Sequence, residues 1–358
     1  MANNPKVFIV SPALSMGGME RASVNTANGL RQLGCEVVFL SFFKKDHFFK
    51  LDGGVKLLEP TGFNITSLSL FQSILWIRKE IKRERPDTIL VFSKLYGAIT
   101  ALSLVGLDAP LYISERSSPL FKWRFHFELI SKIAYFLNPP KGVIAQTKIA
   151  AEYQKKYFKK SKVLVIPNSV RDVTMYPEIK RKKVILAVGR LNDHLKGFDL
   201  LLDSIALLKN QDWELHIAGG DEEGDELKRQ AVNLNIRHRV KFLGKIKDID
   251  RCYAYAGIFV IPSRSEGFPN VLAEAMAAGC CCLAFDFVAG PQDMIDNNEN
   301  GFIVPQNDIK KMAQKIDYLI LNRDKRIKVG EKATLIRNSL NVKFISRKIY
   351  NLILDIHD

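Results

Sequence analysis

The sequence has few cysteines, no long hydrophobic segment and no glycine-rich phosphate loop, and each absence excludes a class of protein. Its five cysteines, Cys35, Cys252 and the run from Cys280 to Cys282, have neither metal-ligand spacing nor the pattern of a disulfide framework, which favours a reducing compartment. The longest lipid-like stretch, 95–107, is shorter than the roughly 20 residues that span a bilayer. The start of the chain lacks the basic segment of a signal peptide. We therefore expect a cytoplasmic protein, with any membrane contact peripheral.

The two halves of the chain differ strongly in charge. The 358 residues carry a net charge of +15, and residues 1–170 hold 24 lysines and arginines against 12 acidic residues. Such asymmetry indicates a polyanionic neighbour, which can be an anionic membrane, a phosphorylated substrate or a nucleic acid. The segment Phe121–Phe127 interleaves rings with Lys122 and Arg124, a composition that suits an anionic lipid surface. An ordinary helix face explains that segment equally well.

Short β-branched runs alternate with helix-length segments throughout, which predicts an α/β protein with two doubly wound parallel sheets. We expect domains at 1–170 and 171–341, and a final helical segment, 342–358, that packs back on the first domain. Ligands of such sheets bind beyond the carboxyl ends of the strands, so we expect a site in a cleft between the domains. The predicted strands are Val7–Val10, Val37–Ser41, Thr88–Phe92, Leu111–Ser114, Gly142–Ala145, Val163–Ile166, Val184–Val188, Glu214–Ala218, Val240–Leu243, Ile258–Ile261, Cys281–Phe285 and Phe302–Val304.

Two glutamates eight positions apart, Glu266 and Glu274, follow one of these strands. A helix spanning both would place their carboxylates on nearly the same face, roughly 12 Å apart. The turn-forming Gly267 and Pro269 place Glu266 in the loop that enters the helix and Glu274 inside it. Taken alone, the pair is more simply a solvated helix face.

Cations and glycines follow other strands. Arg190 and Lys196 suit a diphosphate leaving group, because a guanidinium can bind two of its oxygens while an ammonium neutralises the developing charge. Gly17-Gly18 precedes a helical segment and lets the backbone approach a ligand closely. The turn 289–293 can add backbone amides, with a plain turn equally possible.

Further polar pairs leave alternatives open. Glu115 can accept a proton from an incoming hydroxyl and Arg116 can hold an acceptor phosphate, or the two form a structural loop contact. Asp248 and Asp250 resemble a metal-binding triplet, but we expect them to cap a helix, since cations already serve the diphosphate.

Gly189-Arg190 to Lys196-Gly197, followed by Pro262 to Gly279 with its two glutamates, resembles the signature of family 4 retaining glycosyltransferases, which have the GT-B fold. The likeness extends to Gly17–Arg21 and to Gly290–Gly301, and so covers nearly the whole chain. The chain resembles bacterial enzymes that synthesise surface polysaccharides, lipopolysaccharide and lipid-linked glycans.

The resemblance implies roles for individual residues. Arg190 and Lys196 would bind the diphosphate of a nucleotide-sugar, Glu274 the ribose hydroxyls, and Glu266 the transferred sugar near its reacting face. A backbone contact near Ile246 would hold the uracil. Many relatives have histidine near Glu115, and this chain does not, which leaves the acceptor-side base open. The residues expected around the donor are Gly17, Gly18, Arg190, Lys196, Ile246, Glu266, Phe268, Asn270, Val271 and Glu274.

We therefore expect a retaining, metal-independent hexosyltransferase that moves a hexose or N-acetylhexosamine from a UDP-linked donor to a lipid-linked or polysaccharide acceptor. It would act at the inner face of the plasma membrane, bound peripherally to anionic lipid, and would need neither a cofactor nor nucleic acid. One alternative is a GT-B enzyme with a soluble acceptor, like sucrose or trehalose synthases. A remote one is a basic nucleic-acid-binding protein, in which the N-terminal half tracks a phosphate backbone.

Overall fold

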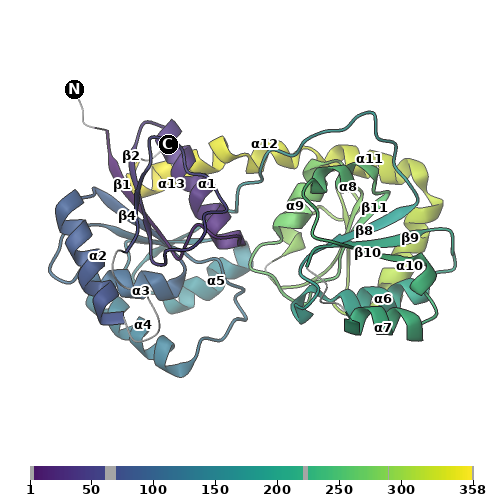
Figure 1. Cartoon of the computed structure of the whole chain (residues 1–358), viewed down its shortest axis with the longest axis horizontal. Coiled ribbons are helices and arrows are strands. Elements are labelled where there is room, and N and C mark those ends of the chain that lie inside the picture. Colours follow the sequence, from purple (N-terminus) through teal and green to yellow (C-terminus); the bar gives the residue numbers. More distant parts are fainter. Residues whose placement is uncertain (1–3, 61–69, 221–224, 289, 357–358) are drawn as a thin grey trace. The chain divides into compact units, whose positions relative to one another are not determined.

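The computed structural model describes residues 4–60, 70–220, 225–288 and 290–356. The chain forms two compact units, the first made of residues 1–169 and 342–358 and the second of residues 170–341 (Figure 1). The N-terminal segment of the first unit thus ends one residue before position 170, the boundary expected from the sequence. In the described part of the chain, no helix is long and apolar enough to cross a membrane.

The first unit is built on a seven-stranded parallel sheet with the order β3-β2-β1-β4-β5-β6-β7. Buried apolar runs form its central strands, as is usual for parallel sheets covered on both faces. The strand order reverses direction between β1 and β4. The strands are β1 (Lys6–Ser11), β2 (Glu36–Ser41), β3 (Lys56–Leu58), β4 (Thr88–Phe92), β5 (Leu111–Ser114), β6 (Gly142–Ala145) and β7 (Lys162–Val165).

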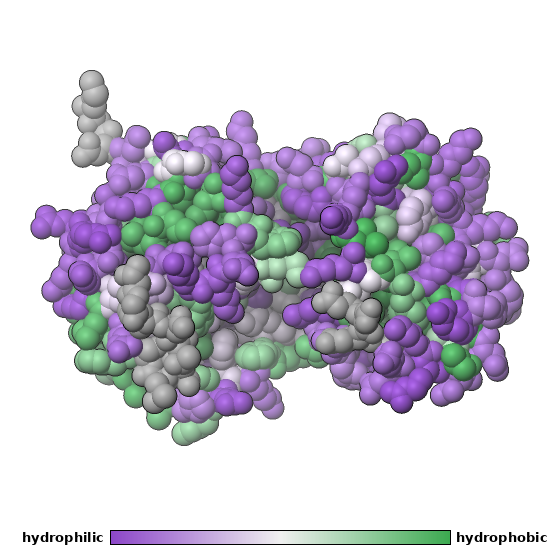
Figure 2. Space-filling model, viewed as in Figure 1, coloured by the Kyte–Doolittle hydropathy of each residue, from purple (hydrophilic) through white to green (hydrophobic). Residues whose placement is uncertain are grey.

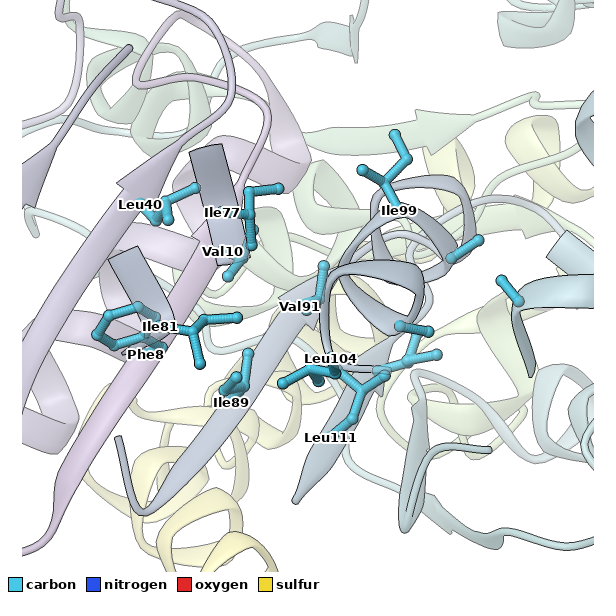
Figure 3. Packing of buried hydrophobic residues seen from close by; sticks show 14 of the residues in the cluster. Phe8, Val10, Leu40, Ile77, Ile81, Ile89, Val91, Ile99, Leu104 and Leu111 are labelled. Carbon is cyan, nitrogen blue, oxygen red and sulfur yellow. The ribbon is translucent and has the colours of Figure 1, made fainter. Parts of the chain in front are cut away.

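Alternate residues of these strands point into one apolar core (Figure 3). Phe8 and Ile89, from neighbouring strands, lie beside Ile81 of α2 (Leu70–Glu84), and Leu111 lies beside Leu104. Helices α3 (Lys94–Ser103) and α4 (Phe125–Leu137) complete this layer. Helix α5 (Lys148–Tyr157) contacts β6 and β7.

The C-terminal helix α13 (Val342–Ile353) belongs to the first unit, where it packs against α1 (Gly18–Gln32). Its buried residues Ile345, Ile349 and Leu352 recur with helical spacing. The two helices approach so closely that a Cβ added at Gly29 would lie 1.9 Å from Ser346 Oγ and 2.6 Å from its Cβ. A glycine is therefore required at this crossing.

The second unit contains a six-stranded parallel sheet with the order β10-β9-β8-β11-β12-β13. Its order reverses between β8 and β11, which pair directly through Ile258 with Ile185 and Phe259 with Leu186. The two doubly wound sheets expected from the sequence are thereby confirmed. The strands are β8 (Val184–Val188), β9 (Glu214–Ala218), β10 (Val240–Gly244), β11 (Ile258–Ile261), β12 (Cys282–Phe285) and β13 (Phe302–Val304).

Helices cover both faces of this second sheet (Figure 1). They are α6 (Phe198–Ala206), α7 (Asp225–Asn233), α8 (Ile249–Tyr255), α9 (Asn270–Ala277), α10 (Ile309–Leu321), α11 (Arg323–Ala333) and α12 (Ile336–Leu340), with short 3-10 turns at η2 (His194–Lys196), η3 (Arg237–Arg239) and η4 (Pro291–Asp293). All five cysteines are free and buried, and burial raises the pKa of the Cys281 thiol to about 12. They act as small apolar side chains.

The close crossing of α1 and α13 gives a first prediction. Replacing Gly29 with valine should lower the free energy of unfolding by about 1–3 kcal/mol, because the added atoms overlap Ser346 and force the helices apart. Urea unfolding measures the change. Gly53→Ala is the control, since no atom lies within 4 Å of a Cβ built there. A Gly29→Val protein as stable as the wild type would contradict the packing described.

Candidate functional site

The candidate site lies at the carboxyl ends of β8 and β11, the two strands between which the second sheet reverses its order. Connections leave such strands toward opposite faces and open a crevice between them. The loop after β8 carries Arg190 and Lys196, and the loop after β11 carries Glu266. The topology therefore brings together residues separated by about 70 positions in the sequence.

Local turn chemistry fixes the loop after β8. Asp193 caps η2 by accepting a hydrogen bond from the Leu195 amide at 3.1 Å. Gly197 follows with φ +68°, and a Cβ there would lie 2.0 Å from the Pro262 carbonyl oxygen. Only glycine permits this approach, which presses the β8 loop against the start of the β11 loop.

Lys196 and Glu266 form an ion pair between the two loops. Lys196 Nζ lies 2.7 Å from Glu266 Oε1, and the two side chains are 18% and 12% exposed. Ser263 Oγ donates to the same carboxylate oxygen at 2.8 Å. This half-buried ammonium sits where it can neutralise an anion, beside a carboxylate held in a fixed orientation.

Arg190 stands apart from this pair. Its side chain is 75% exposed, and its guanidinium pairs with Asp193 at 2.8 Å within the same loop. The described contacts thus join Lys196 to Glu266 and leave Arg190 on the rim, where its side chain can turn without disturbing the fold.

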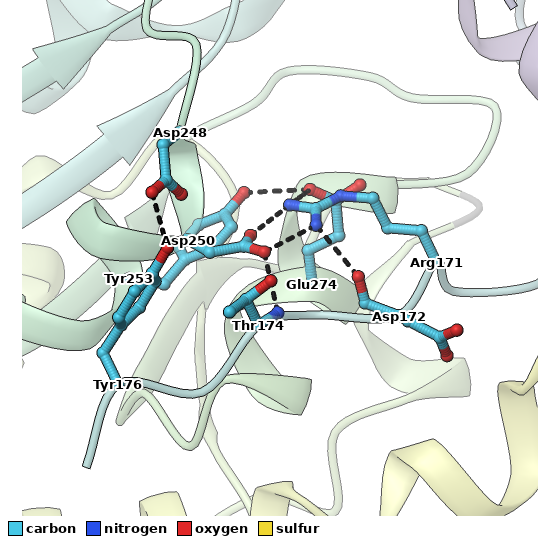
Figure 4. Close-up of polar contacts among 8 residues, drawn as sticks. All are labelled: Arg171, Asp172, Thr174, Tyr176, Asp248, Asp250, Tyr253 and Glu274. Carbon is cyan, nitrogen blue, oxygen red and sulfur yellow. Dashed lines mark hydrogen bonds and ion pairs between the residues drawn. The ribbon is translucent and has the colours of Figure 1, made fainter.

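Glu274 lies inside α9 and is buried, with 4% of its surface exposed. Its Oε2 atom accepts hydrogen bonds from Arg171 Nη2 and from the Tyr253 hydroxyl, each at 3.3 Å (Figure 4). The helix begins only at Asn270, so it does not span both glutamates as the spacing suggested. Glu266 does lie in the entering loop and Glu274 in the helix, as predicted.

Asp248 and Asp250 do not cap α8, as the sequence had suggested. Asp248 occupies the N-cap position of α8 but makes no side-chain cap hydrogen bond, and its carboxylate instead accepts from the Tyr176 hydroxyl at 2.6 Å. Asp250 binds the Arg171 guanidinium through both oxygens and accepts from the Thr174 amide at 2.8 Å (Figure 4). Burial would raise the pKa of Asp250, but these hydrogen bonds outweigh it and lower the pKa. The helix-capping interpretation was wrong because an arginine distant in sequence takes the carboxylate.

The remaining donor-side candidates surround these groups. Phe268 is buried, and the Asn270 amide donates to the Phe268 carbonyl at 2.9 Å, which closes the turn into α9. Val271 occupies the second position of α9, in the turn whose amides lack acceptors within the helix. Ile246 is half-buried in the loop after β10.

The turn after β12 also reaches this region. Ser265, next to Glu266, forms an isolated parallel bridge with Val288. Gly290 and the short turn η4 follow, whereas position 289 lies outside the described residues.

A cavity of about 540 Å³ adjoins the loop after β8, between the starts of α6 and α7. Four carboxylates line it, those of Asp193, Asp199, Asp225 and Glu226. Three of these carboxylates are paired with cations: Asp193 with Arg190, Asp199 with Arg264 and Asp225 with Lys228. The ammonium of Lys196 is not among the groups that line this cavity.

The first unit holds the other candidates, and these belong to its own strand ends. Gly17 is extended and precedes α1, which begins at Gly18. Glu115 is buried, and its carboxylate accepts from the Lys94 amide at 2.6 Å and the Ser117 amide at 2.8 Å. The first bond fixes the turn at Ser93, a non-glycine residue with φ +88°. These contacts favour a structural role, and proton acceptance by Glu115 stays a prediction.

Arg116 lies beside that turn. Its guanidinium donates to the Asn168 side chain and lies 5.1 Å from the centre of the Phe92 ring. Among all the residues that the structure describes, no group of three or more histidine, cysteine or acidic side chains could hold a metal ion.

Comparison with known proteins decides the family. Residues 174–335 match the family described as glycosyl transferases group 1, and residues 16–172 match glycosyltransferase family 4. An uncharacterized glycosyltransferase of Haemophilus influenzae is 30% identical over 345 residues, which cover 94% of this chain and 96% of the relative. This chain belongs to the family 4 glycosyltransferases.

Two further comparisons place this glycosyltransferase among its relatives. A Campylobacter jejuni α-1,4-N-acetylgalactosaminyltransferase that acts on an undecaprenyl-diphosphate-linked glycan is 28% identical, over 88% of this chain and 89% of its own. The structure of Anabaena HepE in complex with UDP is 19% identical and superposes with a TM-score of 0.83, over 98% of this chain and all of that one. The glycosyltransferase therefore has the GT-B fold, as the sequence predicted.

Sequence reasoning missed Arg171, Tyr253 and Ser263. Arg171 follows the expected domain boundary, in a polar segment that carries no motif. The glycosyltransferase signature contains Ser263, but its spacing alone does not reveal that the hydroxyl binds Glu266.

The Asp250 contacts generate the second prediction. Asp250→Asn should destabilise the protein at pH 7 by roughly 2 kcal/mol, the scale of hydrogen bonds to a charged group. Because the folded-state pKa lies below the usual 3.8, the stabilisation is present above that value and is lost as the pH falls toward the lowered pKa.

Urea unfolding at pH 7 and at pH 3 tests this dependence. The difference between wild type and variant should shrink at the lower pH. Asp248→Asn is the control and should change stability little, because the hydrogen bond between Asp248 and Tyr176 is exposed. Equal destabilisation by the two variants would contradict the role assigned to Asp250.

Proposed function

We propose that this glycosyltransferase moves a hexose or N-acetylhexosamine from a UDP-sugar to a lipid-linked or polysaccharide acceptor, with retention and without a metal ion. The observation that carries the proposal is the 2.7 Å pair of Lys196 and Glu266 at the reversal of the second sheet. In this proposal the ammonium serves a diphosphate and the neighbouring carboxylate serves the sugar. The named substrate of the Campylobacter relative and the UDP bound to HepE support the acceptor and donor classes.

In this proposal Lys196 binds the diphosphate and stabilises the charge that grows on it as the sugar leaves. Arg190 turns from Asp193 to bind two further oxygens, since its exposed side chain is not fixed by packing. Two cations then do the electrostatic work for which other enzymes use a divalent metal.

Glu266 orients the sugar, and its fixed position argues against a covalent role. Both Lys196 and Ser263 bind its Oε1 atom, which lowers its nucleophilicity. The acceptor hydroxyl would attack the anomeric carbon on the face from which the diphosphate departs. The bond from that carbon to the diphosphate oxygen breaks, a bond to the acceptor oxygen forms, and the hydroxyl proton passes to the diphosphate. Configuration is retained.

The third prediction concerns the two cations. Lys196→Met and Arg190→Ala should each reduce kcat for donor-dependent transfer by about 10²–10³, the usual cost of removing one group that stabilises transition-state charge. A screen of UDP- and GDP-sugars for slow donor hydrolysis first identifies the donor. Lys183→Ala, an exposed lysine paired loosely with Asp212 at 3.5 Å, is the control. Normal turnover of folded Arg190→Ala or Lys196→Met protein would refute the proposed donor site.

The acceptor proposal includes an anionic membrane surface on the first unit. Helix α4 exposes Phe125, Leu129, Ile133 and Phe136, spaced by four, four and three residues and so aligned on one face. Phe125 is 81% and Phe136 78% exposed. Figure 2 shows hydrophobic surface along the edge of the first unit where Figure 1 labels α4.

Exposed cations flank this stripe, those of Lys122, Arg124 and Lys132. Rings that enter the interface and cations that meet anionic headgroups are the features of peripheral membrane helices. We propose that this face binds the inner leaflet of the plasma membrane, where a lipid-linked acceptor would be presented. A GT-B enzyme with a soluble acceptor needs no such face.

The fourth prediction tests that surface. A Phe125→Ser, Phe136→Ser protein should partition onto phosphatidylglycerol vesicles at least about tenfold less than the wild type, because two large apolar side chains no longer leave water. Leu321→Ser, equally exposed at 78% but in the second unit, should partition normally. This part of the proposal would be contradicted if the wild-type protein did not bind the vesicles. It would also be contradicted if the wild-type protein bound unrelated DNA with a steep salt dependence.

A further inference from the structure

The buried cluster around Glu274 contains two carboxylates and one guanidinium (Figure 4). Asp250 and Glu274 are 5% and 4% exposed, and Arg171 lies between them. Its Nη1 atom donates to Asp250 Oδ2 at 2.8 Å, while Nη2 bonds Asp250 Oδ1 and reaches Glu274 Oε2 at 3.3 Å. One guanidinium therefore balances part of the charge of both acids.

Asp250 orients Arg171 more strongly than Glu274 does. Two parallel hydrogen bonds fix the plane of the guanidinium, and the Thr174 amide holds the same carboxylate at 2.8 Å. Arg171 also donates to the Asp172 carbonyl at 3.1 Å. The longer bond to Glu274 is thus made by an arginine whose direction is already set.

Tyr253 adds a second donor to the same Glu274 oxygen. The Tyr253 side chain is fully buried, and its hydroxyl lies 3.3 Å from Glu274 Oε2. Both donors come from outside α9: Arg171 from the start of the second unit and Tyr253 from α8. The rotation of the Glu274 carboxylate is therefore restricted from two directions.

We propose that Arg171 and Tyr253 are positioning residues that aim the Glu274 carboxylate at the 2′ and 3′ hydroxyls of the donor ribose. The inference rests on the proposed function and on the role that the family resemblance implies for Glu274, which is to bind those hydroxyls. A carboxylate selects a diol only when its orientation is fixed, because a rotating one pays an ordering cost on binding. Arg171 and Asp250 thereby set the preference for a ribonucleotide without contacting it.

The test compares the affinity of the full-length protein for UDP and for 2′-deoxy-UDP by calorimetric titration. The wild type should prefer UDP by about tenfold or more, the scale of a hydrogen bond to a charged group. Arg171→Gln and Tyr253→Phe should each lower that ratio at least about threefold. UDP itself should bind more weakly, while 2′-deoxy-UDP should change less.

A purely structural role would weaken both nucleotides equally and leave the ratio unchanged. Arg239→Gln provides the matched control: Arg239 is another buried arginine of this unit, it bonds the Ile205 and Asn210 carbonyls, and it precedes β10 at the amino end of the strand. It should lower stability without changing the ratio.

Removing Arg171 leaves two buried carboxylates without their shared cation, so Arg171→Gln can fail to fold. Tyr253→Phe keeps the aromatic ring and all charges. If Arg171→Gln does not fold, this variant alone tests the inference. If both variants fold and their preference for UDP is unchanged, the inference is overturned and the proposed function stays intact. If Arg171→Gln does not fold, an unchanged preference in Tyr253→Phe has the same consequence. A wild type that binds UDP and 2′-deoxy-UDP equally well, or binds neither, overturns the ribose role of Glu274 and this inference with it.

Discussion

The ion pair of Lys196 and Glu266 is the interaction on which the donor site depends. It joins the loops after β8 and β11, and those loops meet because the second sheet reverses its strand order between these two strands. Gly197 packs against the Pro262 carbonyl and so fixes their separation. A cation and a carboxylate at one strand edge can then serve a diphosphate and the sugar attached to it.

Two arginines of the second unit hold backbone ends and side chains in place. Arg181 donates to the Ala278 and Gly279 carbonyls at the end of α9, and to the Tyr253 and Ala256 carbonyls at the end of α8. These are helix termini whose carbonyls lack partners and carry partial negative charge. Arg171 binds side chains instead, since its guanidinium donates hydrogen bonds to two carboxylates at once. The rigid framework that results suits a site in which groups must point at a ligand before it arrives.

Much of this arrangement could be predicted from the sequence, because it follows from local patterns. Strands such as Thr88–Phe92 and Val184–Val188 are continuous apolar runs, and the structure confirms them with the same bounds. The short edge strand Lys56–Leu58 escaped notice, since its burial is incomplete and it has no periodic pattern. Glu266 and Lys196 were found through their motif, and the structure adds that they touch.

What could not be predicted lies in contacts between distant residues. Arg171 is 79 positions from Asp250 and 103 from Glu274, so no window of sequence reveals the cluster. Asp248 and Asp250 matched a helix start, yet tertiary partners took both carboxylates. Glu115 lies in a loop whose residues suggest a catalytic role, but backbone amides donate hydrogen bonds to both of its carboxylate oxygens.

Hydrogen exchange of the full-length protein with and without UDP tests the central claim most directly. The account predicts slower exchange at residues 189–197 after β8 and 262–274 after β11, where the diphosphate, sugar-side and ribose groups lie. Unchanged exchange in both segments at saturating UDP would contradict it.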